Sequence, residues 1–116
     1  MNIKLITAFL LILLLSGCAE TGGVKYYWGD YSDTLYSLKK DPTPETELRH
    51  IEELQDIIEV STEKGFKVPP GVQAELGYRY AQKGEMEQTR GLFNSELTTY
   101  PESKFFIERL QEMLEE

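Results

Sequence analysis

TPETELRHIEELQDIIEVSTEKG, residues 43–65, is a stretch in which apolar residues recur every three or four positions. That spacing predicts one apolar stripe along a helix over about residues 45–64. The stripe consists of Leu48, Ile51, Leu54, Ile57, Ile58 and, more weakly, Val60. Thr43 can cap this helix, Pro44 suits its first turn, and Gly65 can end it. No strand-like alternation persists anywhere in the chain, so the expected fold class is all-α.

The only histidine of the chain, His50, lies in this helix between charged neighbours. We expect it to face solvent, because a lone histidine without cysteines or a partner motif is a poor metal or catalytic candidate. Acidic pairs such as Glu52 and Glu53 are interpreted as solvated charge. No glycine-rich phosphate loop and no metal-ligand cluster stand out, so the sequence predicts no enzyme and no cofactor.

An aromatic segment precedes the long helix, in YYWGDYSDTLYSLKK, residues 26–40. Four aromatic residues fall within six positions: Tyr26, Tyr27, Trp28 and Tyr31. Leu35 and Leu38 follow Tyr31 at helical spacing and predict a short helix over about 32–39. The aromatic residues have two interpretations. They either pack in the core, or they form an exposed face for a partner or for a nearby membrane.

The chain after the long helix breaks at KVPPG, residues 67–71, and a new helix is expected to begin near Pro70. The following stretch, AELGYRYAQKGEMEQTRGLFNSELTTYPES (residues 74–103), resembles one tetratricopeptide repeat, an antiparallel helix pair. The matching positions are Leu76, Gly77, Tyr80, Gly84, Phe93 and Pro101. The repeat is degenerate at three positions, where an aromatic residue and two alanines are usual: Gln73, Thr89 and Glu96.

The resemblance implies a packing role for each matching residue. Gly77 lets two helices approach closely, and Gly84 supplies the turn between them. Tyr80 and Phe93 are expected to fill the space between the pair. Because one repeat cannot bury its own faces, helices over 45–64 and 102–115 must cover it. The last helix carries an apolar stripe of Phe105 or Phe106, Ile107, Leu110, Met113 and Leu114.

The first residues of the chain have the features of a secretory signal peptide. Lys4 is followed by an apolar run over 5–15, which is shorter than the roughly 20 residues that span a bilayer as a helix. The end of this run, Leu15-Ser16-Gly17-Cys18, resembles the lipobox that the signal peptidase of bacterial lipoproteins recognises. The alternatives are a plain secreted protein with an incidental cysteine, or an uncleaved anchor.

The lipobox resemblance implies that the chain is cut before Cys18 and that this cysteine carries covalent acyl chains such as palmitate. A lipoprotein cysteine with three chains is released from a bilayer very slowly, whereas one chain binds only marginally. The next residue is Ala19, where aspartate resembles an inner-membrane retention signal of enteric-type bacteria. By that analogy we expect the periplasmic face of the outer membrane.

Cleavage at the lipobox divides the chain into three parts. Residues 1–17 are the expected signal peptide, 18–29 the lipidated N-terminus and tether, and 30–116 the helical domain. The whole chain has 12 basic and 20 acidic residues and a formal net charge of −8 at pH 7. This charge argues against nucleic acid as a partner, because contacts with the phosphate backbone require clustered lysine and arginine.

The order of these motifs along nearly the whole mature chain resembles a family of small bacterial lipoproteins of unknown function, often encoded beside CsgG-like lipoproteins. That resemblance implies an accessory part of an outer-membrane assembly, with a CsgG-like lipoprotein as a candidate partner. The sequence therefore predicts an anchored protein-interaction module. Its candidate partner surface comprises Tyr27, Trp28, Tyr31, Tyr78 and Tyr80.

Two alternatives to this function remain open from the sequence. One is an envelope-maintenance lipoprotein that contacts the cell wall without a dedicated protein partner. The weaker one is an enzyme or small-ligand carrier with a pocket between its helices.

Overall fold

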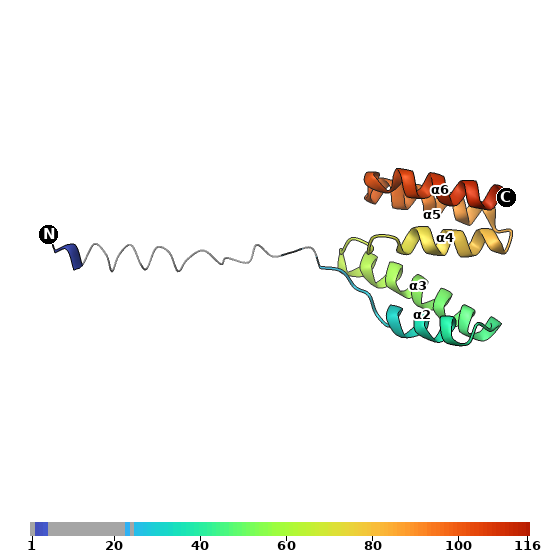
Figure 1. Ribbon diagram of the computed structural model, residues 1–116, viewed down its shortest axis with the longest axis horizontal. Coiled ribbons are helices and arrows are strands. Elements are labelled where there is room, and N and C mark those ends of the chain that lie inside the picture. Colours follow the sequence, from blue (N-terminus) through green and yellow to red (C-terminus); the bar gives the residue numbers. More distant parts are fainter. Residues whose placement is uncertain (1, 5–22, 24) are drawn as a thin grey trace.

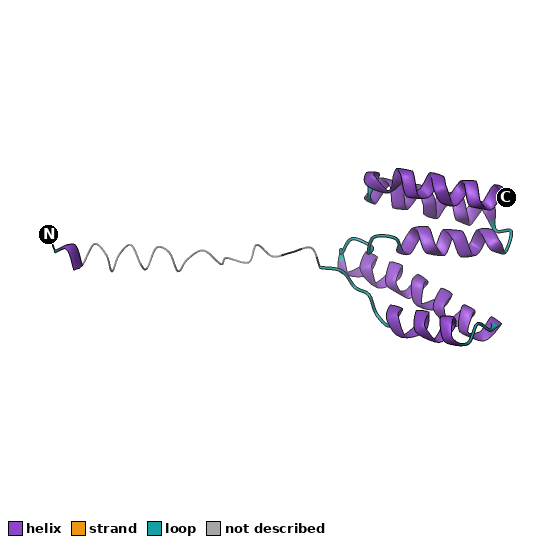
Figure 2. Cartoon of the chain, viewed as in Figure 1, coloured by secondary structure: helices purple, strands orange, loops and turns teal. Residues whose placement is uncertain are grey.

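A computed structural model describes residues 2–4, 23 and 25–116 of the chain. The lipobox and the predicted lipidation site Cys18 lie outside these residues, as does most of the predicted signal peptide. The described residues form helices and loops without a strand, which confirms the all-α class (Figure 2). Within that described part, no helix combines the length and the hydropathy needed to cross a membrane.

The helices follow one another as an antiparallel stack (Figure 1). Each helix from α2 to α5 contacts the next one, and α6 contacts both α4 and α5. The bounds are α2 (Tyr31–Lys40), α3 (Pro44–Lys64), α4 (Val72–Gln82), α5 (Met86–Thr99), the 3-10 turn η1 (Pro101–Ser103) and α6 (Lys104–Glu115). The helices expected over 32–39, 45–64 and 102–115 are confirmed within two residues, and the expected start near Pro70 falls at Val72.

Both ends of α3 are determined by local sequence, as predicted. The Thr43 hydroxyl accepts a hydrogen bond from the backbone N–H of Thr46 at 3.2 Å. In return the Thr46 hydroxyl accepts one from the backbone N–H of Thr43 at 3.0 Å, which completes a capping box with Pro44 in the first turn. Gly65 ends the helix with φ +68°, a left-handed conformation that glycine adopts without strain.

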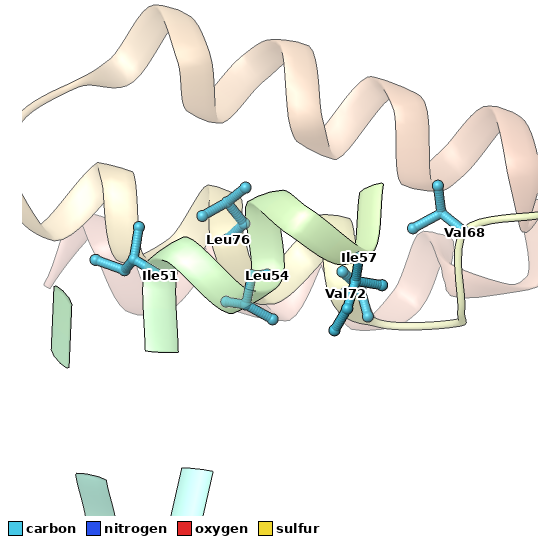
Figure 3. Close-up of a cluster of buried hydrophobic side chains, with 6 residues drawn as sticks. All are labelled: Ile51, Leu54, Ile57, Val68, Val72 and Leu76. Carbon is cyan, nitrogen blue, oxygen red and sulfur yellow. The ribbon is translucent and has the colours of Figure 1, made fainter. Parts of the chain in front are cut away.

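The first core cluster lies between α3 and α4 and includes the loop that joins them (Figure 3). Its buried members are Ile51, Leu54, Ile57, Val68, Val72 and Leu76. Tyr27, Tyr31 and Tyr80 pack against its edge. Tyr80, expected to fill the space between α4 and α5, also packs against the cluster between α3 and α4. Its ring covers the α3 side of α4, and its hydroxyl accepts a hydrogen bond from the Gln55 side chain.

Two assignments on α3 are wrong because a spacing of three residues drifts around a helix. At about 100° per residue, Leu48 lies about 120° away from Leu54, whereas His50 lies only about 40° away. Leu48 is accordingly 51% exposed and His50 is completely buried. His50, Leu54, Ile57 and Ser61 occupy one heptad-like line, and all four are buried.

The second core cluster joins the helix pair α4–α5 to α6. Ala74, Phe93 and Ile107 are buried in it, and Leu97, Leu110 and Leu114 pack around them. The expected stripe on α6 is correct for Ile107, Leu110 and Leu114. It is wrong for Phe105, Phe106 and Met113, which are exposed. Phe105 lies about 160° around the helix from Ile107, so only one of the two can face the core.

The three residues that depart from the repeat pattern are buried, and two of them, Thr89 and Glu96, link α5 to α4 by hydrogen bonds. Thr89 donates from its hydroxyl to the carbonyl of Gly77 at 2.9 Å, which links α5 to α4. Glu96 accepts a hydrogen bond from the backbone N–H of Gly71 at 2.8 Å, at the residue that caps α4. A polar side chain from α5 thus supplies a cap that the sequence of α4 lacks.

The two glycines of the repeat have the predicted roles. Gly84 has φ +81° in the turn between α4 and α5. At Gly77 an added Cβ would lie 2.8 Å from Cε1 of the Phe93 ring and 3.3 Å from Cβ of Leu92. Because the Phe93 ring is itself buried, it cannot move aside freely. The absence of a side chain at Gly77 therefore sets the distance between α4 and α5.

Substitution of Gly77 by alanine is expected to lower the free energy of unfolding by about 1–2 kcal/mol, because overpacking outweighs the better helix propensity of alanine. Gly91→Ala is the matched control, since it is also a helical glycine but has no atom within 4 Å of the added Cβ. That variant should gain up to about 1 kcal/mol. Urea unfolding of both variants measures the two changes, and equal changes would contradict the close-contact role of Gly77.

Candidate functional site

A buried polar network joins α2, α3 and α4 beside the first core cluster. The Nε2 atom of His50 lies 3.0 Å from Oε2 of Glu75, and Nδ1 lies 2.8 Å from the Thr34 hydroxyl. The Tyr31 hydroxyl donates to Oε1 of Glu75 at 2.9 Å. The rings of Tyr31 and His50 are 5.2 Å apart. Glu75 of α4 thus accepts hydrogen bonds from α2 and α3 together.

The contacts of His50 fix one of its protons. A carboxylate only accepts hydrogen bonds, so Nε2 must carry the hydrogen that points to Glu75. The Thr34 hydroxyl has one proton and two acceptors within reach, Nδ1 of His50 and the carbonyl of Tyr31 at 3.2 Å. The hydroxyl can donate its proton to Nδ1 when Nδ1 carries no hydrogen. When Nδ1 is protonated, the hydroxyl can accept from it and donate to the Tyr31 carbonyl instead. The site therefore accommodates both charge states of His50 without an unpaired ring nitrogen.

The network keeps Glu75 ionised and Tyr31 protonated. Burial alone would raise the pKa of Glu75, but hydrogen bonds from His50 and Tyr31 and the charges of His50 and Arg79 lower it overall. Burial, followed by the charge and hydrogen bond of Glu75, raises the pKa of Tyr31 to about 12. A fixed negative charge thus lies at the centre of the network, with 23% of the Glu75 side chain exposed.

An apolar cleft of about 330 Å³ opens beside Glu75. It lies between the segment before α2, the first two turns of α4 and the start of α6. The lining residues are Trp28, Tyr31, Pro70, Gly71, Val72, Glu75, Tyr78, Phe106 and Leu110. Trp28 packs edge-on against Tyr31 with their ring centres 5.3 Å apart. The cleft is therefore an apolar hollow with four aromatic rings and one carboxylate in its wall.

The structure brings together three of the five residues of the predicted partner surface. Trp28, Tyr31 and Tyr78 line the cleft, whereas Tyr27 and Tyr80 lie outside it. Tyr78 and Tyr80 are two positions apart in α4 and so project about 160° apart around the helix, which prevents them from sharing one face.

Tyr27 lies against α3 and helps to hold the segment before α2 in place. Its hydroxyl donates to Asp56 at 3.2 Å, and Nζ of Lys64 lies 5.3 Å from the centre of its ring. The backbone N–H of Asp30 donates to Glu53 at 2.7 Å. These contacts attach the segment to α3 and position Trp28 over the cleft.

Sequence reasoning missed several residues of the site, among them His50, Glu75, Phe106 and Leu110. The heptad-like line of His50 with Leu54, Ile57 and Ser61 was a signal that could have found the buried histidine. Glu75 offered no such signal, because its partners come from helices distant in sequence.

Tyr80 lines a separate, shallower groove of about 510 Å³ between α3 and α5. A third hollow, of about 440 Å³, is lined mainly by acidic residues of α2 and α3. Among the residues that the structure describes, no group of His, Cys, Asp or Glu has the arrangement of a metal site. The aromatic cleft is thus the place where the predicted surface and a shaped hollow coincide.

A comparison with protein families identifies the family of this chain. The model of a family described as a domain of unknown function (DUF4810) matches residues 25–110. This range extends from the segment before α2 into α6 and includes every residue that lines the cleft. No curated protein and no solved structure matches the chain.

Glu75→Gln is expected to lower the free energy of unfolding by about 1–2 kcal/mol at pH 7, because it removes the charge that His50 and Tyr31 stabilise. A lowered pKa means that this stabilisation is present above the ordinary value of 4.5 and is lost as the pH falls below it. The difference from the unsubstituted protein should therefore shrink between pH 5 and about pH 3.

Chemical unfolding as a function of pH measures this difference. Glu59→Gln, at an exposed position of the same helix as His50, is the control and should have a small effect at each pH. A difference for Glu75→Gln that stays constant with pH would contradict the ionised network.

Proposed function

The chain belongs to the DUF4810 family, whose function is unknown, and from this premise and its cleft we propose that it is a lipid-anchored protein-interaction module. The module acts at the periplasmic face of the outer membrane and catalyses no reaction. It holds a segment of another envelope protein in the aromatic cleft.

The observation that carries the proposal is the cleft itself. Trp28, Tyr78 and Phe106 come from three separate parts of the chain and leave an apolar hollow in a small acidic domain. Aromatic side chains that remain partly exposed around a hollow are typical of the central residues of protein interfaces. The buried network beneath them holds Tyr31 in one position, so the cleft is formed before a partner arrives.

The shape and charge of the cleft favour a particular kind of segment. A volume of about 330 Å³ suits one or two bulky apolar side chains better than a folded domain. The ionised Glu75 in the wall accepts a hydrogen bond from a donor on the segment, such as a backbone N–H, a lysine or an arginine. The proposed ligand is therefore a short peptide segment with an apolar anchor beside a donor group.

The anchor and the location rest on the lipobox resemblance at Leu15–Cys18 and on Ala19. In the lipoprotein family that the chain resembles, a CsgG-like lipoprotein is often encoded nearby, which makes such a protein the first candidate partner. The enzyme alternative receives no support from the cleft. The described residues of its lining include one carboxylate, Glu75, and no histidine, cysteine or lysine beside it, and the Thr34 hydroxyl that meets His50 is buried.

Tyr78→Ala is expected to reduce the yield of the bound partner at least tenfold, because it removes one wall of the cleft. The tagged, lipidated protein is purified from crosslinked outer membranes, and enriched proteins are quantified by mass spectrometry. Tyr36→Ala is the matched control, since Tyr36 is 65% exposed on α2 and does not line the cleft. That variant should retain the partner.

Three results would count against this proposal. A partner that survives Tyr78→Ala but is lost with Tyr80→Ala would bind the groove between α3 and α5 instead. Protein that enriches no partner but sediments with purified cell wall would support the envelope-maintenance alternative. An unmodified Cys18 in the intact mass of the mature protein would remove the anchor.

A further inference from the structure

One end of the helix stack differs in composition from the rest of the molecule. The starts of α2, α4 and α6 meet the ends of α3 and α5 at the end where the described chain enters the domain (Figure 1). We call this the tether end and define it by residues 25–28, 63–71 and 100–106. These segments contain seven of the 13 aromatic residues in the chain.

Four of the seven aromatic residues of the tether end are exposed, and the other three are partly or fully buried. Phe105 is 82% exposed, Phe106 51%, Trp28 42% and Tyr26 36%. The other large apolar residues exposed on α2 to α6 lie outside the tether end: Tyr36, Leu48, Met86 and Met113. Core packing does not account for Phe105, which projects from the side of α6 opposite to Ile107. This residue also lies outside the lining of the aromatic cleft.

The charge of the tether end is opposite in sign to that of the whole chain. Its three segments contain four lysines and two glutamates, whereas the chain carries a formal charge of −8. The lysines are Lys25, Lys64, Lys67 and Lys104. Lys64 and Lys67 lie over the rings of Tyr27 and Tyr100 at 5.3 and 5.9 Å from the ring centres. Exposed aromatic rings mixed with lysines are characteristic of surfaces at the lipid–water interface.

From this arrangement we infer that the tether end docks on the surface of an anionic bilayer, with Phe105 and Trp28 at the interface and the lysines at the headgroups. The orientation of the domain rests on the proposed lipid anchor, because it depends on the short linker between Cys18 and the tether end. Residues 18–24 reach at most about 25 Å, whereas α3 alone is about 32 Å long. The linker thus holds this end nearest to the membrane, and the docked domain stands upright on it.

The chain provides its own probe and its own attachment point for a test. Trp28 is the only tryptophan and Cys18 the only cysteine. The mature chain, residues 18–116, is coupled through the Cys18 thiol to a maleimide lipid in vesicles of phosphatidylethanolamine and phosphatidylglycerol. Acyl chains brominated near the headgroup then quench Trp28 if it lies at the interface. The coupling is chemical, so the docking is tested even if the cell does not lipidate the protein.

Docking predicts at least twofold quenching of Trp28 relative to vesicles without bromine, and weaker quenching when phosphatidylcholine replaces the anionic lipid. Phe105→Asp should abolish most of the quenching, because it places a charge at the interface while the exposed position leaves the fold intact. Tyr36→Asp, at a similarly exposed site away from the tether end, should leave quenching unchanged. Circular dichroism verifies that both variants are folded.

Two results would overturn the inference. One is quenching that is absent in the unsubstituted protein or identical in Phe105→Asp. The other is a Trp28 that bromine does not quench but that becomes more shielded from acrylamide as the surface density of the protein rises. That result would mean that a second copy of the chain covers this end. The two proposals can fail independently. If Tyr78→Ala loses the partner in the purification but retains the quenching of Trp28 on vesicles, the cleft and the docking surface have separate roles.

Discussion

The carboxylate of Glu75 is the contact on which the arrangement of the first three helices depends. It belongs to α4 and accepts hydrogen bonds from Tyr31 at the start of α2 and from His50 in the middle of α3. Apolar packing could join these helices in several relative positions, since apolar contact is not directional. Hydrogen bonds of 2.9 and 3.0 Å to one carboxylate leave much less freedom. The network therefore fixes α2 and its aromatic segment against the repeat.

Even a partly buried ionised group such as Glu75 is costly unless its partners compensate, so this network is better explained by specificity than by net stability. An apolar substitute of the same size could hold α3 against α4 equally well. It would not place the Tyr31 ring where it supports Trp28, and Trp28 forms a wall of the cleft. The network around Glu75 is energetically costly, but it positions Tyr31 and Trp28. The cleft at the surface therefore keeps its shape without a ligand.

The sequence predicted those features that short-range rules determine. The ends of α3, the turn at Gly84 and the close approach at Gly77 each depend on a few adjacent residues or on one matched position of a repeat. The burial of His50 does not follow from a stripe of apolar residues spaced by three, because that spacing drifts around a helix. The cleft was only half predicted, because Glu75, Phe106 and Leu110 join it through the fold and not through any local pattern.

The cleft and the tether end share Trp28, Pro70, Gly71 and Phe106, and this overlap constrains the proposed partner. If the tether end rests on the bilayer, the cleft opens immediately beside the membrane surface. A segment that binds in the cleft must then belong to a part of the partner protein that lies close to the same leaflet. A partner anchored there is held at high effective concentration and needs only modest intrinsic affinity for the cleft. A second lipoprotein meets that geometric condition, whereas a protein diffusing freely in the periplasm gains nothing from it.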